Sequence, residues 1–132
     1  MTDTDTRDRR PWPRLRDAIV VLAAALVTPT ALAHAVVEWS QPPANGVVAP
    51  GELHVRVQFS SRIDVARSRL VLIAPDGRQT TLAPDAVDKP GLVTATTRVA
   101  CDGRFTLHWQ VLSLDGHVTR GDVPFRVGGA AR

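Results

Sequence analysis

The chain has 132 residues, a length that suggests one domain. It carries 16 Lys and Arg against 13 Asp and Glu, and beyond the first third its basic residues are scattered. Because nucleic-acid-binding proteins gather basic residues into a patch or run, this distribution argues against a nucleic-acid role. A single cysteine, Cys101, excludes an intramolecular disulfide. We expect Cys101 to be a small buried residue, with a thiol metal ligand as the alternative.

The first 33 residues have the pattern of a secretory signal peptide. Five arginines precede an apolar run at 18–27, and Ala31-Leu32-Ala33 resembles a cleavage site. The alternative, a membrane anchor, is disfavoured because about 20 apolar residues are needed to cross a bilayer. We predict cleavage after Ala33, with the export route left open by Arg9-Arg10. Five basic and four acidic residues then leave with the signal, so the mature domain at 34–132 keeps 11 and nine.

The mature region predicts short strands separated by turns. In the segment Leu53–Phe59, apolar residues alternate with His54, Arg56 and Gln58, which we place on a solvent face. We expect a short helical turn at 63–69 and further strands at 69–74, 79–82, 92–99, 105–111 and 123–127. The sequence therefore predicts an all-β sandwich or barrel.

Four histidines lie in the predicted mature chain: His34, His54, His108 and His117. His54 and His108 occupy outward positions of alternating strands, which predicts ordinary solvated side chains. Cleavage after Ala33 would make His34 the first residue, with a free α-amine beside its imidazole. The amine and the ring Nδ1 can then chelate one metal ion. The alternative is that a histidine follows the cleavage site by chance.

Asp115 and His117 form the second candidate element, because residues two apart in extended backbone point to the same side. Gly116 between them allows the backbone to bend. An Asp-Gly turn with a chance histidine is the alternative. Together with His34, the pair supplies an amine nitrogen, two imidazole nitrogens and a carboxylate oxygen. Such a set suits Cu(II), with Zn(II) as the main rival. Met1 is the only methionine, so the mature chain lacks a thioether site for Cu(I).

Several short motifs occur in a fixed order along the mature chain: Ala31-Leu32-Ala33 before His34, Pro43-Ala44-Asn45-Gly46, Pro50 before Val57-Gln58-Phe59-Ser60, Gly103-Arg104-Phe105 leading to Trp109, and Val111–His117 followed by Gly121 and Phe125-Arg126-Val127. In this order and spacing the mature chain resembles the CopC family of copper-binding proteins. The resemblance implies an immunoglobulin-like Greek-key sandwich or barrel of about seven strands. It also implies one Cu(II) bound by an N-terminal histidine brace, carried over as His34, Asp115 and His117.

Two departures from the family pattern point to a Cu(II)-only binder. Ser61 stands where many relatives have an acidic residue near the copper, and the methionine-rich Cu(I) site of some relatives is missing. The resemblance further implies a periplasmic carrier or buffer in copper resistance or homeostasis, without enzymatic activity. Its expected partner is an inner-membrane copper transporter of the CopD type, and we expect a monomer.

Two other functions stay open on sequence alone. A copper-dependent oxidative enzyme would use the same brace, although 99 mature residues leave little room for a flat substrate surface. The third hypothesis is a metal-free sandwich that docks onto a membrane partner. We expect Trp109 to belong to the core rather than to a metal site, since its indole N–H only donates.

Overall fold

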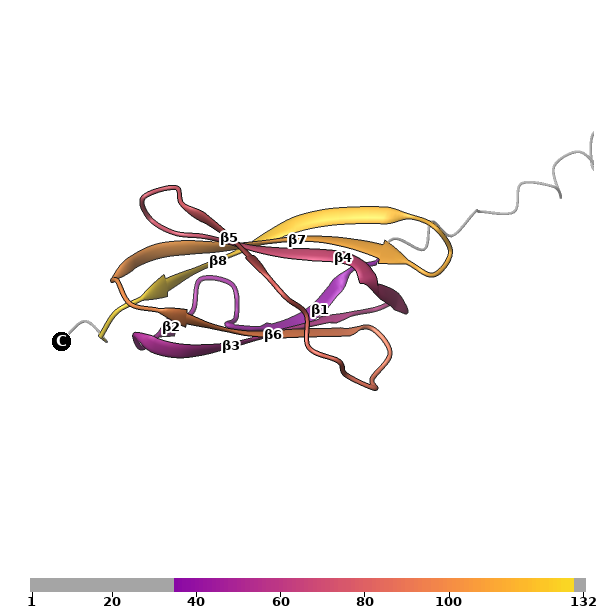
Figure 1. Ribbon diagram of the computed structural model, residues 1–132, viewed down its shortest axis with the longest axis horizontal. Coiled ribbons are helices and arrows are strands. Elements are labelled where there is room, and N and C mark those ends of the chain that lie inside the picture. The colour runs from indigo at the N-terminus through magenta and orange to yellow at the C-terminus, as the bar shows by residue number, and fades with distance from the viewer. Residues whose placement is uncertain (1–34, 130–132) are drawn as a thin grey trace, which may run out of the picture. The chain divides into compact units, whose positions relative to one another are not determined.

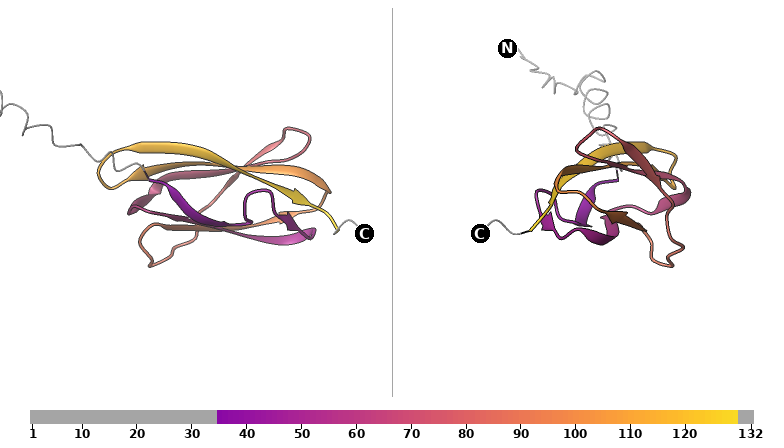
Figure 2. Two further views of the ribbon diagram at one scale, coloured as in Figure 1. Left: turned by 180° about the vertical axis from the view of Figure 1, so that it is seen from behind. Right: turned by 60° about the vertical axis from the view of Figure 1, so that its left-hand side comes forward.

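The computed structural model describes residues 35–129, which form two β-sheets packed face to face (Figure 1). The smaller sheet has the order β1-β3-β6, with β1 at Val37–Gln41, β3 at Gly51–Phe59 and β6 at Leu92–Val99. The larger has the order β2-β8-β7-β4-β5, with β2 at Val47–Val48, β8 at Val118–Val127, β7 at Gly103–Ser113, β4 at Ile63–Ile73 and β5 at Gln79–Leu82. The two layers are seen edge-on in Figure 1 and again from behind in Figure 2.

The core lies between the sheets and follows the alternation of the sequence. The inward-facing apolar residues that alternate along β3 and β7 are buried, namely Leu53, Val55, Val57, Phe59, Phe105, Leu107, Trp109 and Val111. Phe59 and Trp109 meet across the sheets edge to face, with ring centroids 5.0 Å apart and planes at 71°. The predicted all-β sandwich is confirmed, with eight strands among the described residues rather than about seven. Trp109 is a core residue, as expected.

The expected helical turn at 63–69 is wrong, because this segment is the first half of β4. Ile63 pairs with Ser113 and Asp64 with Leu112 on β7, and an irregularity follows before pairing resumes at Arg69. Within the irregular part, Ser68 Oγ donates to the carbonyl of Asp64 at 2.7 Å. The pairing with β7 therefore overrides a local preference for a turn. β8 likewise extends beyond the expected strand, and β1 and β2 were not predicted.

Gln58 departs from the expected pattern of β3, since only 7% of its surface is exposed. Pro90 and Gly91 lie against its side chain, and its Nε2 donates to the carbonyls of Phe59 and Pro90 at 3.0 and 3.2 Å. Cys101 also differs from its predicted burial, but it is more exposed than predicted. It was expected to be buried, but it is exposed in the turn between β6 and β7.

Four segments meet at one end of the sandwich, which we call the hairpin end: residues 35–36, 60–62, 85–91 and 113–118. Backbone hydrogen bonds join them in pairs. Ser60 N donates to Val36 O at 2.9 Å, Leu114 N to Arg62 O at 3.1 Å, and Phe59 N to Gly91 O at 2.8 Å. In Figures 1 and 2 the start of β1 and the β7–β8 turn lie at this same end. Within residues 35–129, no helix is long and apolar enough to span a membrane.

Candidate metal centre

The turn between β7 and β8 carries two of the three predicted metal ligands. The last pair of the β7–β8 ladder is Leu112 with Val118, and Ser113 N donates to the carbonyl of His117 at 2.9 Å. Gly116 N then donates to the carbonyl of Ser113 at 2.9 Å. Gly116 has φ +90°, a conformation that side-chain-bearing residues rarely adopt. The glycine thus allows the chain to reverse between Asp115 and His117.

The side chains of Asp115 and His117 are brought together by this turn. His117 Nδ1 lies 3.3 Å from Asp115 Oδ1, and the backbone N–H of His117 donates to the same oxygen at 3.2 Å. The sequence analysis expected the two side chains to point to the same side of an extended backbone. They do lie side by side, but in a turn, because the chain reverses direction at Gly116. Both side chains are accessible, with 41% of Asp115 and 56% of His117 exposed. A carboxylate oxygen and an imidazole therefore face solvent from one rigid turn.

The charge state of Asp115 is set mainly by the backbone. The N–H of His117 holds the pKa of the Asp115 carboxyl below its ordinary value of 3.8. Desolvation is the second-largest effect and raises this pKa, while the hydrogen bond and the electrostatic interaction with the His117 side chain each lower it by less. Asp115 is thus ionised at neutral pH, as a metal-ligating carboxylate must be.

The third predicted ligand, His34, lies outside the described residues, as does the predicted signal peptide at 1–33. The residues that follow it are firmly placed. Ala35 is 4% exposed and belongs to the core, and Val36 N donates to Ser60 Oγ at 3.1 Å. The chain therefore enters the sandwich at the hairpin end, which also carries Asp115 and His117.

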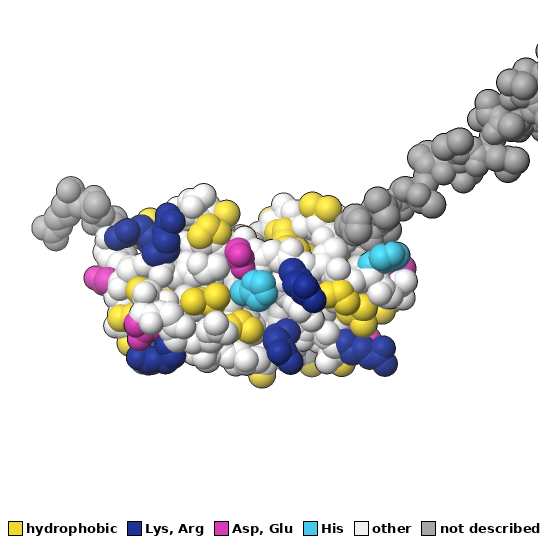
Figure 3. Space-filling view, turned by 90° about the horizontal axis from the view of Figure 1, so that it is seen from above, with side chains coloured by type: hydrophobic (Ala, Val, Ile, Leu, Met, Phe, Trp, Pro, Cys, Tyr) yellow, Lys and Arg dark blue, Asp and Glu magenta, His cyan; other side chains and the backbone are white. Residues whose placement is uncertain are grey.

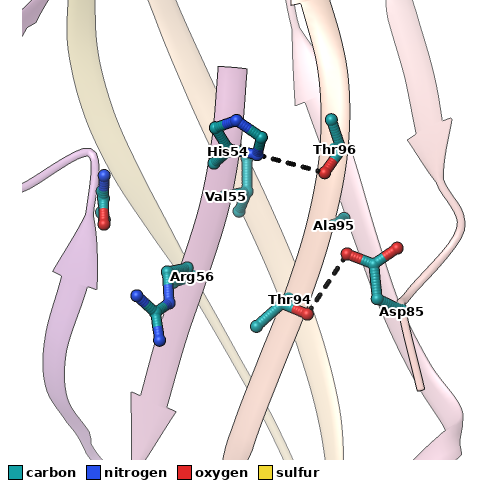
Figure 4. A pocket seen from close by; sticks show the side chains of 8 residues that line it. His54, Val55, Arg56, Asp85, Thr94, Ala95 and Thr96 are labelled. Carbon is teal, nitrogen blue, oxygen red and sulfur yellow. Dashed lines mark hydrogen bonds between the residues drawn. The ribbon is translucent and has the colours of Figure 1, made fainter. Parts of the chain in front are cut away.

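His54 lies away from this turn, on the outer face of the smaller sheet. Its Nε2 is 3.0 Å from Glu52 Oε1 and its Nδ1 is 3.3 Å from Thr96 Oγ1. It borders a groove of about 380 Å³ that also contains Arg56 and Asp85 (Figure 4). Its exposed, outward position is as predicted.

His108 is paired through the strand register with a residue that the sequence does not single out. It lies opposite Asp122 on β8, and its Nδ1 is 2.6 Å from Asp122 Oδ1. The two residues are 14 positions apart, so only the antiparallel register of β7 and β8 reveals the contact. The His108 side chain is 39% exposed, in agreement with an outward strand position.

Within the described part of the chain, no three His, Cys, Asp or Glu side chains lie together in a metal-binding arrangement. The hairpin turn supplies two donors of the kinds that Cu(II) and Zn(II) accept. Residues 35–129 therefore contain two of the three predicted ligands and no complete metal-binding group. Cys101 does not contribute, because it lies in the β6–β7 turn, at the opposite end of β7 from Asp115 and His117.

Comparison with known protein families identifies the family of this β-sandwich domain. The CopC domain matches residues 37–128, which is most of the chain and includes the whole β7–β8 hairpin. The chain belongs to the CopC family. Protein YobA of Escherichia coli strain K12 is 29% identical over 116 residues, covering 86% of this chain and 94% of YobA. Copper resistance protein C of Xanthomonas campestris pv. juglandis is 25% identical over 116 residues, covering 83% of this chain and 91% of that protein.

Solved structures show the same fold. CopC from Methylosinus trichosporium OB3b superposes with a TM-score of 0.67 at 24% identity, covering 75% of this chain and 98% of that one. PcoC, a methionine-rich copper resistance protein from Escherichia coli, gives a TM-score of 0.55 at 22% identity, covering 73% of this chain and all of PcoC. The two-sheet architecture described above is therefore the architecture of the CopC family.

Proposed function

We propose that this protein is an exported Cu(II) carrier or buffer in copper resistance or homeostasis, which binds one ion through His34, Asp115 and His117. The observation that carries the proposal is the Asp115–His117 pair, held by one exposed turn at the hairpin end. The chain enters the sandwich at that end through Ala35, the residue bonded to His34. A donor group on His34 therefore starts from the end where the other two donors already face solvent.

The chemistry of the donors favours Cu(II) as cargo. After cleavage at Ala33, the α-amine and imidazole of His34 would join the imidazole of His117 to give three nitrogens, and Asp115 would add an oxygen or orient the site. A tetragonal nitrogen and oxygen set of this kind is typical of Cu(II), which also stands highest in the affinity order of divalent metals. The names of Copper resistance protein C and of the methionine-rich PcoC place copper in the family. Unlike PcoC, this chain has a single methionine, Met1, so we propose Cu(II) without a Cu(I) site.

The signal-peptide pattern at 1–33 supports a periplasmic location. A carrier needs an acceptor, and we propose an inner-membrane copper transporter of the CopD type for that role. Small size and accessible ligands suit a protein that binds and releases its cargo rather than one that transforms a substrate.

The decisive experiment combines N-terminal sequencing of the exported protein with a Cu(II) titration and electron paramagnetic resonance. We expect His34 as the first residue and one tightly bound Cu(II) with nitrogen hyperfine coupling. We expect a variant with one alanine inserted between Ala33 and His34 to be cleaved after Ala33 and to begin with alanine, so that His34 has no α-amine. It should lose most of its copper affinity while its thermal unfolding stays unchanged.

A control variant and an activity assay test whether the loss of copper affinity comes from the missing α-amine of His34. An alanine inserted after Gly129, far along the chain from the site, controls for the insertion itself and should leave affinity intact. Unchanged copper affinity in the variant extended before His34 would show that the brace is wrong. Sustained hydrogen peroxide production by the copper-loaded protein would replace the carrier by an oxidative enzyme.

A further inference from the structure

Two hydroxyl groups of the β7–β8 hairpin are buried without a hydrogen-bond partner. Ser113 is 2% exposed, and neither its Oγ nor Thr119 Oγ1 has a partner within residues 35–129. A buried hydroxyl that lacks a partner costs free energy, because it has given up its hydrogen bonds to water. Gln58 Oε1 shares this property, but its side chain lies on the other sheet and is anchored through Nε2. The two hydroxyls lie on the hairpin whose turn carries Asp115 and His117.

Ser113 and Thr119 lie on the inner side of the larger sheet. The buried positions alternate along β7, and Ser113 is the last of them, after Trp109 and Val111. Thr119 lies opposite Val111 on β8, and residues that are paired in an antiparallel ladder share one face. The outer face of this sheet, seen in Figure 3, carries exposed histidine, acidic and basic side chains. The two hydroxyl-bearing residues therefore face the space between the sheets.

His117 belongs to the same side of the hairpin. Ser113 N donates to the carbonyl of His117 at 2.9 Å, just beyond the last ladder pair, Leu112 with Val118. Residues that face each other across two antiparallel strands have their side chains on one face. Ser113, His117 and Thr119 are therefore neighbours on the inner side of the hairpin, next to the turn.

The chain enters the sandwich close to these residues. Ala35 is buried and lines a pocket of about 410 Å³ together with Trp109 and Gly121. Trp109 and Gly121 are paired in the ladder, two positions along from Thr119. Positions two apart in a strand are separated by about 7 Å. On the inner face, Thr119 is therefore flanked on one side by the pair beside Ala35 and on the other by His117.

We infer that Ser113 and Thr119 are positioning residues of the proposed metal site, and that their hydroxyls hold His34. The inference rests on the proposed function and adds no metal ligand to it. When His34 binds Cu(II) through its α-amine and ring Nδ1, the amine and ring Nε2 still carry N–H groups. The hydroxyl oxygens accept hydrogen bonds from these groups, which fixes the orientation of His34 toward the metal. Each hydroxyl thereby gains the partner that residues 35–129 do not supply.

A Cu(II) titration and thermal unfolding of the exported, processed protein test this inference. Ser113→Ala and Thr119→Val each remove one hydroxyl and change the side-chain volume little. Each should raise the dissociation constant for Cu(II) about tenfold, as is typical when a hydrogen bond to a metal ligand is lost. The metal-free variants should unfold at the temperature of the parent protein or above it, because an unpartnered buried hydroxyl has been removed. The rise in unfolding temperature caused by Cu(II) should be smaller than in the parent.

Two matched variants control for the substitutions. Thr119→Ser keeps the hydroxyl and should restore Cu(II) affinity to nearly that of the parent protein. Thr106 is also half-buried on this hairpin, but it lies opposite Pro124 on the outer face. Thr106→Val should therefore leave the Cu(II) affinity unchanged. Electron paramagnetic resonance should show the same nitrogen coupling in every variant, since no ligand is removed.

The outcomes separate this inference from the proposed function. Parental Cu(II) affinity in both Ser113→Ala and Thr119→Val would overturn the inference alone. A lower unfolding temperature of the metal-free variants with an unchanged rise on adding Cu(II) would also overturn it, because the hydroxyls would then serve the fold, for instance by holding a buried water. If the parent protein itself binds no Cu(II), the proposed function fails and the inference fails with it.

Discussion

His117 Nδ1 lies 3.3 Å from Asp115 Oδ1, with one glycine between the two residues in the chain. The backbone N–H of His117 holds the same oxygen at 3.2 Å, so the carboxylate is fixed by the turn itself. Neither Asp115 Oδ2 nor His117 Nε2 takes part in the contact between Asp115 Oδ1 and His117. This relationship holds the side chains of the two proposed ligands, Asp115 and His117, beside each other.

Replacing Asp115 by Asn should weaken Cu(II) binding while keeping the turn. The Asn side-chain oxygen can still accept from His117 N–H, but the charged ligand is lost. We expect affinity to fall about tenfold or more, as seen for changes at metal sites. A competitive Cu(II) titration measures it. Asp122→Asn removes a carboxylate of the His108 pair that is 59% exposed, against 41% for Asp115, and its affinity should match that of the parent protein.

The pKa of the Asp115 carboxyl should lie below 3.8, and it should still lie below 3.8 in His117→Ala. The largest cause is the backbone N–H of residue 117, which alanine retains. Because the pKa is lower in the folded protein than in the unfolded chain, ionisation favours folding above pH 3.8. That contribution is lost as the pH falls through the folded value. Carboxyl-carbon NMR titrations of both proteins check this, and a return to 3.8 in His117→Ala would assign the shift to the side chain.

Asp115 is ionised between pH 5 and 7, so copper loss in that range should come from protonation of nitrogen donors. The Cu(II) affinities of the parent protein and Asp115→Asn should therefore decline in parallel over this interval. Affinity measured at several pH values tests the point. Two curves that converge as the pH falls toward 5 would mean that Asp115 itself takes up a proton there.

The variants His54→Ala and His108→Ala should bind one Cu(II) with unchanged affinity. His54 contacts Glu52 and Thr96 on the smaller sheet, and His108 contacts Asp122 on the larger one. Neither contact belongs to the β7–β8 turn. His117→Ala is the positive comparison in the same titration. A loss of affinity in His108→Ala as large as that in His117→Ala would move the site to the outer face of the larger sheet.

Gly121→Ala should destabilise the fold by about 1–3 kcal/mol through overpacking. A Cβ at this position would lie 2.4 Å from Cζ2 and 2.8 Å from Cε2 of Trp109, which is packed against Phe59. Urea unfolding followed by tryptophan fluorescence measures the change. Gly129→Ala, with no atom within 4 Å of the added carbon, should change the free energy of unfolding by less than about 0.5 kcal/mol.

Local patterns in the sequence were sufficient for most of the fold. The alternation in Leu53–Phe59 and Phe105–Val111 correctly predicted which side chains form the core, because the period of a strand is two. The proximity of Asp115 and His117 could also be predicted from the sequence, because two residues separated by one glycine are close in any fold. Residues 63–69 were mistaken for a helical turn because their partners on β7 lie about 40 to 50 positions further along the chain.

The amino-acid sequence by itself determined an all-β fold, the inward faces of its main strands and the kinds of donor available, because alternation and residue chemistry are local properties. Only the tertiary structure decided what surrounds the Asp115–His117 pair. It joined Val36 to Ser60, Arg62 to Leu114 and Phe59 to Gly91, and thereby brought the chain entry and the β7–β8 turn to one end. It also buried Gln58 and exposed Cys101. Strand register and loop packing set these relationships, and neither follows from residues that are neighbours in the chain.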